Sequence, residues 1–382
     1  MRRSPFVPIA DAWYALRDRW LSSPATQRLL SSFWLTRPIA RRRARTVFDL
    51  CAGFVYSQVL LACVRLQVFE RLRAGPMDLS VLAPALELSE EATRRLLDAA
   101  ASLELLTGRG AGRYGLGRHG AALLGNPAVL AMVEHHALVY RDLVDPVALL
   151  RGTQAPTELS RYWAYASSGV PVGLGAGDVA AYSDLMSASQ TLVADAVLSA
   201  YSLARHRVLL DVGGGDGTFV ATVATRVPQL QCLLFDLPAV AERAQRRFVS
   251  AGLGDRARAI GGDFALDALP RGADLISFVR VLHDHDDAVV LALLQAAWAA
   301  LPPDGQVLIA EPFAGTHGAE PVGAAYFGFY LLAMGRGRAR TVEELGGLLR
   351  CAGFDRLRQC GTAQPLQTGV LIARRAAKKS VS

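Results

Sequence analysis

A glycine cluster behind an apolar segment is the first feature of this sequence that could bind a ligand. The segment VLLDVGGGDGTFV, residues 208–220, has the pattern of a buried strand, a tight turn and the start of a helix. Gly213, Gly215 and Gly217 let the backbone of that turn approach a bound nucleoside without a side chain in the way. The dinucleotide fingerprint needs its third glycine one position later, where Thr218 stands. The spacing therefore predicts nucleoside binding and disfavours NAD.

Three aspartates at the ends of successive apolar segments extend this prediction. Asp211 in VLLDVG can accept hydrogen bonds from a cationic amino-acid group, and Asp236 in LLFDLP can bind both hydroxyls of a ribose. Asp263 in GGDF can bind an adenine amine while Phe264 packs on the ring. A strand-end aspartate often only caps the next helix, but three in register favour a nucleoside ligand with an amino-acid tail and no phosphate. S-adenosylmethionine fits that description better than ATP or NAD.

His283 in the segment VLHDHDD is the candidate base for chemistry at this site. It shortly follows the strand-like segment ADLISFV, and α/β sheets bind ligands beyond the carboxyl ends of their strands. With an ordinary pKa of about 6.5, a histidine is available as a neutral base at physiological pH. Methyl transfer from the sulfonium of S-adenosylmethionine needs aligned reactants and one acceptor for the proton of the attacking group. The alternative interpretation is a buried or helix-capping histidine, and His285 is interpreted as structural.

The motifs DVGGGDG, FDLP, GGDF, VLHDHDD and LPPDGQVLIAEP, in that order, resemble those of the small-molecule O-methyltransferases, which include plant caffeate and acetylserotonin enzymes. The resemblance covers roughly residues 45–375. It implies S-adenosylmethionine as cofactor, a small-molecule substrate and a homodimer. Within that family, residues 35–72 resemble the hydroxycarotenoid O-methyltransferases of photosynthetic purple bacteria. Those enzymes of carotenoid biosynthesis methylate the tertiary 1-hydroxyl of acyclic carotenoids of the hydroxyneurosporene or demethylspheroidene type.

The family resemblance also implies roles for individual residues. His283 stands at the position of the catalytic histidine, and Glu311 in LIAEP at that of a glutamate that orients the histidine through a hydrogen bond. No metal is implied. The implied cofactor-binding residues are Asp211, Gly213, Gly215, Gly217, Asp236, Leu237, Asp263, Phe264 and Arg280.

Two positions depart from the family pattern. His285 replaces the tryptophan that follows the catalytic His-Asp pair, a change that would reshape the pocket wall. The second orienting glutamate of the family would fall near Ala339, which carries no carboxylate. Either Glu311 alone suffices to orient the histidine, or a nearby acid such as Glu343 replaces the missing second glutamate.

The elements that must position these residues follow from hydrophobic periodicity. From Val208 onward, strand-like apolar segments alternate with segments of helical period, which indicates βαβ units and a parallel sheet. Residues 46–70 are predicted to form a helix that is apolar around most of its circumference, and a second subunit could cover this surface. Residues 72–125 predict two helices, the second capped by Ser89, and a hairpin at 108–117, the pattern of a winged helix.

The predicted fold is therefore α/β: a doubly wound, Rossmann-like class I methyltransferase domain preceded by a mainly α-helical dimerisation domain with a winged helix. A Gly- and Pro-rich stretch at Ser167–Asp178 is the expected hinge. We expect a helical extension at 1–45, a dimerisation and substrate-capping domain at 46–185, the S-adenosylmethionine-binding domain at 186–376 and a tail at 377–382.

Two segments are expected to wall an apolar substrate pocket. They are the aromatic run GAAYFGFYLLAM at 323–334 and the helices near 135–147. Such a pocket agrees with a long polyene and more weakly with a flat phenol. The alternative interpretation of the aromatic run is ordinary core or dimer interface.

Composition excludes disorder as the main state, because 52% of the residues are hydrophobic and 20% charged. The apolar uncharged stretches Leu50–Val64 and Pro321–Gly335 have 15 residues each, whereas a membrane-spanning helix needs about 20. The N-terminus lacks the sustained apolar core of a secretory signal. We therefore expect a cytoplasmic protein. An arginine run at 37–45, beside aromatic residues, is interpreted as a solvated helix face, with peripheral contact with a membrane surface as the alternative hypothesis.

The net charge of +7 raises the question of nucleic-acid binding. The second helix of the winged helix carries Arg94 and Arg95 among several acids, a poor face for a phosphate-lined groove, so no nucleic-acid partner is expected. The five cysteines form no CxxC pair, which favours free thiols. Three alternatives stay open: methylation of a phenol, C-methylation of a bacteriochlorophyll-type tetrapyrrole, or a winged-helix regulator that senses S-adenosylmethionine.

Overall fold

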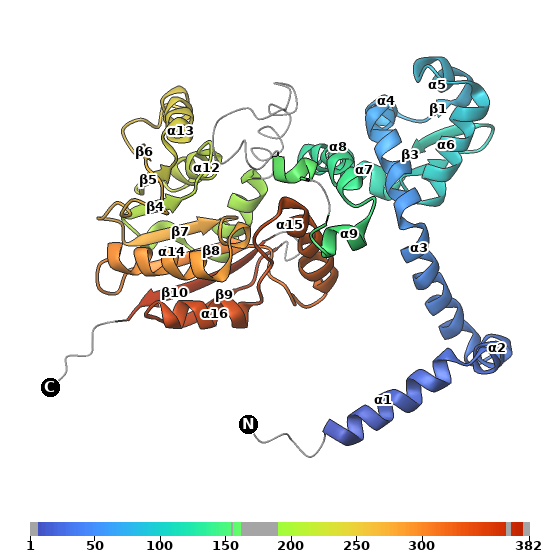
Figure 1. Ribbon diagram of the computed structural model, residues 1–382. Helices are drawn as coiled ribbons and strands as arrows, with labels where there is room; N and C mark the ends of the chain where they lie inside the picture. Colours follow the sequence, from blue (N-terminus) through green and yellow to red (C-terminus); the bar gives the residue numbers. More distant parts are fainter. Residues whose placement is uncertain (1–6, 154–155, 162–189, 364–367, 377–382) are drawn as a thin grey trace. The chain divides into compact units, whose positions relative to one another are not determined.

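A computed structural model describes residues 7–153, 156–161, 190–363 and 368–376 of the chain (Figure 1). The chain divides into two compact units, Met1–Gly125 and Asn126–Ser382. The predicted hinge at Ser167–Asp178 and the expected domain boundary after residue 185 lie outside the described residues. The expected boundary after residue 45 falls inside a continuous helix, α3 (Arg37–Arg65).

The first unit is mainly helical. Its helix α3 includes most of the segment predicted as apolar and helical, and the chain turns at Gln67 into a short further helix. The C-terminal part of α3 packs against α6, and Leu61 and Cys63 are buried there. The other helices of this unit are α1 (Val7–Ser22), α2 (Pro24–Ser32), α4 (Val68–Arg71), η1 (Leu72–Ala74), α5 (Leu79–Ala85), α6 (Glu90–Ser102) and α7 (Arg118–Leu124).

A small sheet confirms the predicted winged helix. Strands β1 (Met77–Asp78), β2 (Leu106–Gly108) and β3 (Arg113–Leu116) pair antiparallel in the order β1-β3-β2. Ser89 caps α6 as predicted, because its side chain accepts a hydrogen bond from the Ala92 amide. The Tyr114 hydroxyl donates to the Asp98 carboxylate at 2.6 Å and so ties the hairpin to α6.

The second unit contains the predicted doubly wound sheet. Its seven strands have the order β6-β5-β4-β7-β8-β10-β9, in which β10 is antiparallel to both of its neighbours and the other pairings are parallel. The chain winds outward from β4 through β5 and β6, then returns to place β7 on the other side of β4. The strands are β4 (Val208–Val212), β5 (Gln231–Asp236), β6 (Ala257–Gly261), β7 (Leu275–Val279), β8 (Gln306–Glu311), β9 (Phe354–Cys360) and β10 (Gly369–Arg375).

Helices cover both faces of this sheet. Successive residues of a strand point to opposite faces, and Leu209 and Leu210 of β4 accordingly belong to two separate hydrophobic clusters. One cluster includes Phe219 and Phe248, from the first two helices after β4; the other includes Leu294, from the helix Asp287–Ala300, and Leu345, from the helix Val342–Cys351. The helices are α8 (Pro127–Asp142), α9 (Pro146–Leu150), α12 (Thr218–Arg226), α13 (Pro238–Ser250), α14 (Asp287–Ala300), α15 (Gly328–Met334) and α16 (Val342–Cys351), with η2 (Leu203–Arg205), η3 (Leu282–Asp284) and the π-helical η4 (Val322–Phe327).

The point where the winding reverses positions the candidate site. Strands β4 to β8 are parallel, so their carboxyl ends meet at one edge of the sheet. The connection after β4 leads to β5 on one side, and the connection after β7 leads to β8 on the other side. Ligands of open α/β sheets bind at such a switch point. Asp236 and Glu311 are the last residues of β5 and β8, and His283 follows β7 in η3.

Candidate active site

The glycine turn after β4 has a backbone that only glycine adopts easily. Gly213, Gly215 and Gly217 have φ angles of +69°, +59° and +81°. A Cβ atom added to Gly213 would lie 2.9 Å from a methyl carbon of Val281, on the loop after β7. The turn therefore lies close to the loop that carries His283, and the backbone of Gly215 has open space beside it.

Asp211 lies beneath this turn and is 1% exposed. The Ser277 hydroxyl donates to its Oδ1 atom at 2.5 Å, whereas Oδ2 has no hydrogen-bond partner in the part of the chain that the structure describes. Burial raises the pKa of Asp211 to about 7, against the lowering effect of the Ser277 hydrogen bond, and the charge of Asp236 raises it further. A buried acceptor without a donor is costly, so Asp211 has capacity for a hydrogen bond that a ligand group could make.

Asp236 joins the tip of β5 to the glycine turn. Its Oδ2 atom accepts a hydrogen bond from the Gly215 amide at 2.8 Å, and its Oδ1 atom accepts one from the Leu237 amide at 2.7 Å. Burial raises the pKa of this carboxyl group, while the two amides act against the rise. Each carboxylate oxygen can accept about two hydrogen bonds. Asp236 is therefore fixed in place and can still accept two more.

Asp263 and Phe264 follow β6 at the same edge. The Asp263 carboxylate accepts a hydrogen bond from the Ala265 amide at 2.8 Å, and Phe264 is half-buried. The Phe264 ring meets the His285 ring edge to face, with the centroids 5.4 Å apart. His285, which replaces the tryptophan of the family pattern, therefore packs beside the expected adenine contact, and burial lowers its pKa to about 4.

Arg280 is the first residue after β7 and has the unusual φ angle of +58°. Its amide donates to the Ala310 carbonyl on the neighbouring strand at 2.8 Å, which holds this backbone in place. Its positive charge lowers the pKa of Asp284 and of Tyr326, so the guanidinium lies near both. Arg280 thus belongs to the His283 side of the site.

The His283 imidazole contacts Glu311 as the family resemblance implies. Its Nδ1 atom lies 3.2 Å from the Glu311 Oε2 atom, and its backbone amide donates to the same oxygen at 3.1 Å. Glu311 is fully buried, and its Oε1 atom has no hydrogen-bond partner within the described residues. Donation from Nδ1 to Glu311 leaves Nε2 as the lone-pair nitrogen of the neutral ring.

A second carboxylate, which the sequence analysis did not identify, contacts the other side of the ring. The Asp284 Oδ1 atom lies 3.2 Å from the His283 Nε2 atom, and Asp284 is buried. Glu343, named above as a possible substitute for the missing glutamate, is exposed on α16. The signal that could have identified Asp284 is its position directly after the histidine, in the acid-rich segment HDHDD.

The two carboxylates control the protonation of His283. Burial by itself lowers the pKa of the imidazole, but the charges of Asp284 and Glu311 outweigh burial and raise the pKa above its ordinary value. Burial raises the pKa of Asp284 to about 6. The pair therefore titrates as a unit, and the neutral imidazole that can accept a proton forms at a higher pH than it would for an isolated histidine.

A buried arginine, also missed in the sequence, holds the loop that carries the histidine. Arg340 is 0% exposed; its guanidinium donates to the carbonyl of Leu282 at 2.8 Å and to that of His285 at 2.6 Å. It also donates to the Asp287 carboxylate at 2.7 Å. The Arg338 amide donates to the His283 carbonyl at 2.9 Å. The backbone carbonyls of Leu282, His283 and His285 therefore all accept hydrogen bonds from the segment 338–340.

The two segments predicted to wall a substrate pocket contact each other, and one of them also contacts His283. The Phe327 ring of η4 lies edge to face with the His283 ring, at a centroid distance of 6.1 Å. Tyr326 and Tyr330 each share a hydrogen bond with a histidine of α8, at 2.7 Å with His136 and at 2.8 Å with His135. These two hydrogen bonds tie η4 and α15 to α8.

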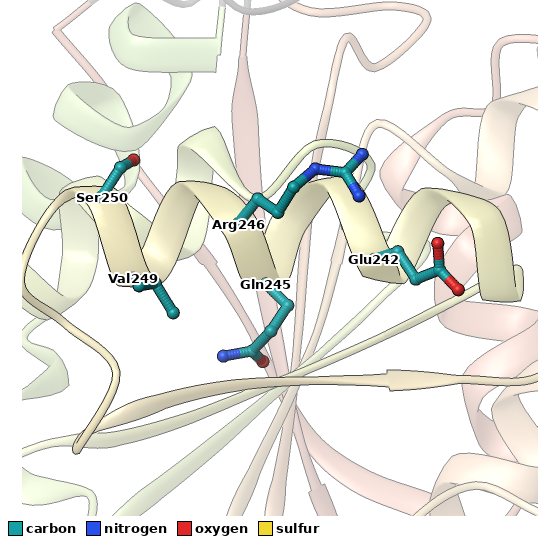
Figure 2. Close-up of a pocket in the computed structure, with 5 residues that line it drawn as sticks. All are labelled: Glu242, Gln245, Arg246, Val249 and Ser250. Atoms are coloured by element: carbon teal, nitrogen blue, oxygen red, sulfur yellow. The ribbon is translucent and has the colours of Figure 1, made fainter.

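A surface hollow of the second unit lies away from these residues. It is lined by five residues of α13, whose side chains Figure 2 shows around that single helix: Glu242, Gln245, Arg246, Val249 and Ser250. None of the predicted site residues lines it. One exposed helix face supplies no set of converging polar groups, so this hollow is not the candidate site.

The site geometry and the comparisons with known proteins agree on a class of enzyme. Residues 142–355 match the O-methyltransferase domain family, and residues 48–126 match the O-methyltransferase dimerisation domain family. The chain belongs to the S-adenosylmethionine-dependent O-methyltransferases.

Within that family, the chain is 44% identical over 330 residues to the demethylspheroidene O-methyltransferase of Cereibacter sphaeroides, an alignment that covers 84% of each chain. The corresponding enzyme of Rhodobacter capsulatus is 41% identical, over 89% of this chain and 84% of that protein. The acetylserotonin O-methyltransferase of Mus musculus is 35% identical, over 83% of this chain and 85% of that protein.

Solved structures support the same fold. The structure of human N-acetylserotonin methyltransferase in complex with SAM is similar with a TM-score of 0.70 and 26% identity, covering 88% of this chain and 98% of that one. The methyltransferase SibL in its apo form has a TM-score of 0.74 at 26% identity, covering 87% of this chain and 99% of that one.

Proposed function

We propose that this enzyme methylates the tertiary hydroxyl of an acyclic hydroxycarotenoid, of the hydroxyneurosporene or demethylspheroidene type, as a step of carotenoid biosynthesis. The observation that carries the proposal is the 44% and 41% identity, over most of the chain, to two demethylspheroidene O-methyltransferases. The aromatic wall beside His283 supports it, since a polyene needs an apolar pocket.

The edge of the sheet offers a fitting set of groups for S-adenosylmethionine. Asp211 supplies an unfilled buried acceptor for the cationic amino-acid group, and the glycine turn supplies close backbone approach. Asp236 supplies two free acceptor positions for the ribose hydroxyls, with the Leu237 backbone beside it. Asp263 and Phe264 supply an acceptor and a ring for adenine. Arg280 borders this set near the catalytic loop.

When bound, S-adenosylmethionine supplies a sulfonium methyl group open to in-line attack by oxygen. His283 accepts the substrate hydroxyl proton at Nε2 as the oxygen–carbon bond forms and the carbon–sulfur bond breaks, with S-adenosylhomocysteine as the leaving group. The transfers coincide because a tertiary alcohol is far too weak an acid to ionise beforehand. Glu311 keeps the Nδ1 proton in place, so that Nε2 is the accepting atom. Asp284 is the group that faces Nε2 in this structure and stabilises the imidazolium formed by proton transfer.

Positioning contributes much of the rate in such a reaction, because the protein supplies one base and no metal is required. Arg340 and the Arg338 amide fix the carbonyls of the catalytic loop, residues 282–285, so the His283 imidazole is held on a rigid backbone. Burial of His283 keeps water away from the proton that is transferred.

A product analysis tests the substrate. The purified enzyme is incubated with S-adenosylmethionine and a detergent-solubilised 1-hydroxycarotenoid, a simple phenol or N-acetylserotonin, and products are identified by mass spectrometry. We expect a methyl ether of the carotenoid only, and none with His283→Ala. Methylation of the phenols but not the carotenoid would favour the second candidate, a phenolic O-methyltransferase, which the 35% identity to acetylserotonin O-methyltransferase supports.

We also propose a cytoplasmic homodimer that contacts a membrane at its periphery. The dimerisation-domain match at residues 48–126 supports the homodimer. A long polyene dissolves in a bilayer rather than in water, so an enzyme that methylates it gains from meeting the bilayer surface. Light scattering coupled to gel filtration tests the dimer, with a monomer mass as the contrary result.

A further inference from the structure

Large apolar side chains are exposed along the N-terminal segment 11–45, which comprises the described side chains of α1 and α2 and the start of α3. Trp13, Trp20 and Trp34 are 65%, 61% and 73% exposed. No side chain described in α1 or α2 is buried. Soluble monomers rarely expose apolar residues in such number, which marks a contact surface. The exposed set further includes Tyr14, Leu16, Leu21, Leu29, Phe33, Leu35 and Ile39.

The spacing of these residues in α1 is that of a helix lying in an interface. Trp13, Leu16 and Trp20 recur at i, i+3 and i+7, so they share one face of the helix. At 100° per residue, Asp11 and Asp18 lie about half a turn away, on the opposite face. Arg17 and Arg19, in the same helix, lie to either side of the apolar stripe. Basic residues beside an apolar stripe and acids behind it are typical of helices that bind anionic lipid.

The charge of the whole chain is concentrated in the same segment. Residues 1–45 contain ten arginines, no lysine and two acids, a net charge of +8, although the full chain has only +7. The other 337 residues therefore carry a net charge of −1. Five of those arginines lie in the first turns of α3 and are exposed: Arg37, Arg41, Arg42, Arg43 and Arg45. Clustered arginines beside an apolar surface complement the negative charge of anionic phospholipid headgroups.

We infer that the N-terminal segment 11–45 docks on the surface of an anionic phospholipid bilayer, with the tryptophans in the headgroup region and the arginines on the phosphates. The inference deepens the proposed function and rests on it for its purpose, since docking brings the pocket to a lipid-dissolved substrate. Tryptophan favours the boundary between headgroups and acyl chains because its ring is apolar and its N–H is polar.

The docking is peripheral rather than membrane-spanning. Among the described residues, α3 is the one helix whose length and composition would allow it to cross a membrane. Its last turns pack into the core of the first unit, where Leu61 and Cys63 are buried. Its first turns carry the arginine cluster. The uncharged part between them has 15 residues, fewer than the about 20 that a span needs.

A second copy of the chain could also cover exposed apolar residues, but the dimerisation-domain match places that contact outside segment 11–45. The exposed apolar residues Phe48, Leu50, Phe54 and Val55 of α3 fall inside the dimerisation-domain match at 48–126. Segment 11–45 precedes that match. A like-charged segment on each copy would also bring together two strongly positive surfaces, which costs free energy.

Vesicle flotation tests the docking on the full-length protein. Phosphatidylcholine vesicles are compared with vesicles that also contain phosphatidylglycerol, at low and high salt, in the absence of any substrate. We expect flotation only with the anionic vesicles, released by high salt because the charge attraction is screened. Flotation that resists a high-salt wash would overturn peripheral docking in favour of insertion, and equal flotation on both vesicles would overturn the role of the arginines.

Two sets of variants locate the contact. Because the changed side chains are exposed, each variant should keep the wild-type circular dichroism spectrum. We expect at least a tenfold loss of partitioning onto anionic vesicles from Arg41→Gln/Arg42→Gln/Arg43→Gln. A control with the same loss of charge on the exposed surface of the first unit, Arg73→Gln/Arg94→Gln/Arg109→Gln, should partition like wild type. Equal losses in both triple variants would mean that net charge alone matters and would overturn the assignment to this segment.

The tryptophan variant Trp13→Ser/Trp20→Ser/Trp34→Ser separates lipid from a second copy. We expect weaker flotation with an unchanged oligomeric mass. A change from dimer to monomer with unchanged flotation would assign the surface to the dimer and overturn the proposal. Activity on detergent-solubilised carotenoid should be the same in this variant as in the wild type. If neither protein methylates the carotenoid, the proposed function is contradicted, whereas the docking result still stands.

Discussion

The Glu311 Oε2 atom accepts both from the backbone amide of His283, at 3.1 Å, and from its imidazole Nδ1 atom, at 3.2 Å. One carboxylate oxygen on β8 therefore fixes the position of the histidine on its loop and the tautomer of its ring. Because Glu311 ends a central strand and is fully buried, this relationship belongs to the rigid part of the sheet. The core of the domain thus orients His283, the proposed base.

His283 should be needed for turnover and not for cofactor binding. We expect His283→Ala to lower kcat by roughly 10²-fold or more, the usual contribution of a general base. Its affinity for S-adenosylhomocysteine, measured by calorimetry, should stay near that of wild type. The exposed His119 provides the matched control, and His119→Ala should retain full activity. Unchanged turnover in His283→Ala would remove this residue from the mechanism.

The Asp284 carboxylate should shift the pH dependence of the reaction. The base must be neutral, and two carboxylates raise the pKa of His283, so kcat/KM of the wild type should fall on the acid side at a pH above about 6.5. Asp284→Asn removes one negative charge beside Nε2, which lowers the pKa of His283 and moves the acid limb to lower pH.

The control for this shift is Asp286→Asn, which changes a carboxylate of the same loop that accepts instead from the Gly337 amide. Its acid limb should coincide with that of wild type. A limb that stays in place in Asp284→Asn, or moves to higher pH, would contradict the charge relationship between the two residues.

Arg340 should act as a positioning residue. Replacement by methionine leaves the carbonyls of Leu282 and His285 without their donors, which should lower the free energy of unfolding by about 2 to 3 kcal/mol. Because the loop then loosens, kcat should fall more than the KM for either substrate rises. Arg340→Lys has fewer donors and no planar fork, so it should restore only part of the lost stability and part of the lost kcat.

Arg338→Gln is the control for Arg340, since this half-exposed side chain shares Asp287 as a partner and contacts no catalytic-loop carbonyl through its guanidinium. Steady-state kinetics measured well below each variant's Tm separate positioning from stability. Wild-type kcat in a destabilised Arg340→Met enzyme would reduce Arg340 to a purely structural residue.

Asp236 should contribute to cofactor affinity. We expect Asp236→Ala to weaken S-adenosylhomocysteine binding by about 1.5 to 3 kcal/mol, the scale of hydrogen bonds to a charged group. Asp236→Asn, which keeps an acceptor for the Gly215 or Leu237 amide, should lose less. Calorimetry on the exposed Asp255→Ala variant should give the wild-type value. Equal affinity in Asp236→Ala would rule out its assignment to the ribose.

Local chemistry in the sequence was enough to predict the sheet edge and most of what lies there. The alternation of apolar segments and helical segments after Val208 predicts a parallel sheet, and parallel strands bring their carboxyl ends to one edge. Asp236, His283 and Glu311 follow such strands, and the structure brings them to that edge. The wing and the Ser89 cap were also predictable, because turns and caps depend on neighbouring residues alone.

Tertiary structure alone decided the environment of the base. Arg340 reaches the carbonyls of Leu282 and His285 only because η3 lies against the segment 338–340, and no local pattern encodes such a long-range approach. Asp284 is the sequence neighbour of His283, but only the folded loop places its carboxylate beside the Nε2 atom. The same holds for Asp211: its carboxylate is bonded by Ser277 of β7, 66 residues further along the chain, and its buried Oδ2 atom has no hydrogen-bond partner among the described residues. Sequence determined which groups stand at the strand ends. The fold decided which charges each group feels, because charge interactions depend on distance in space and on burial.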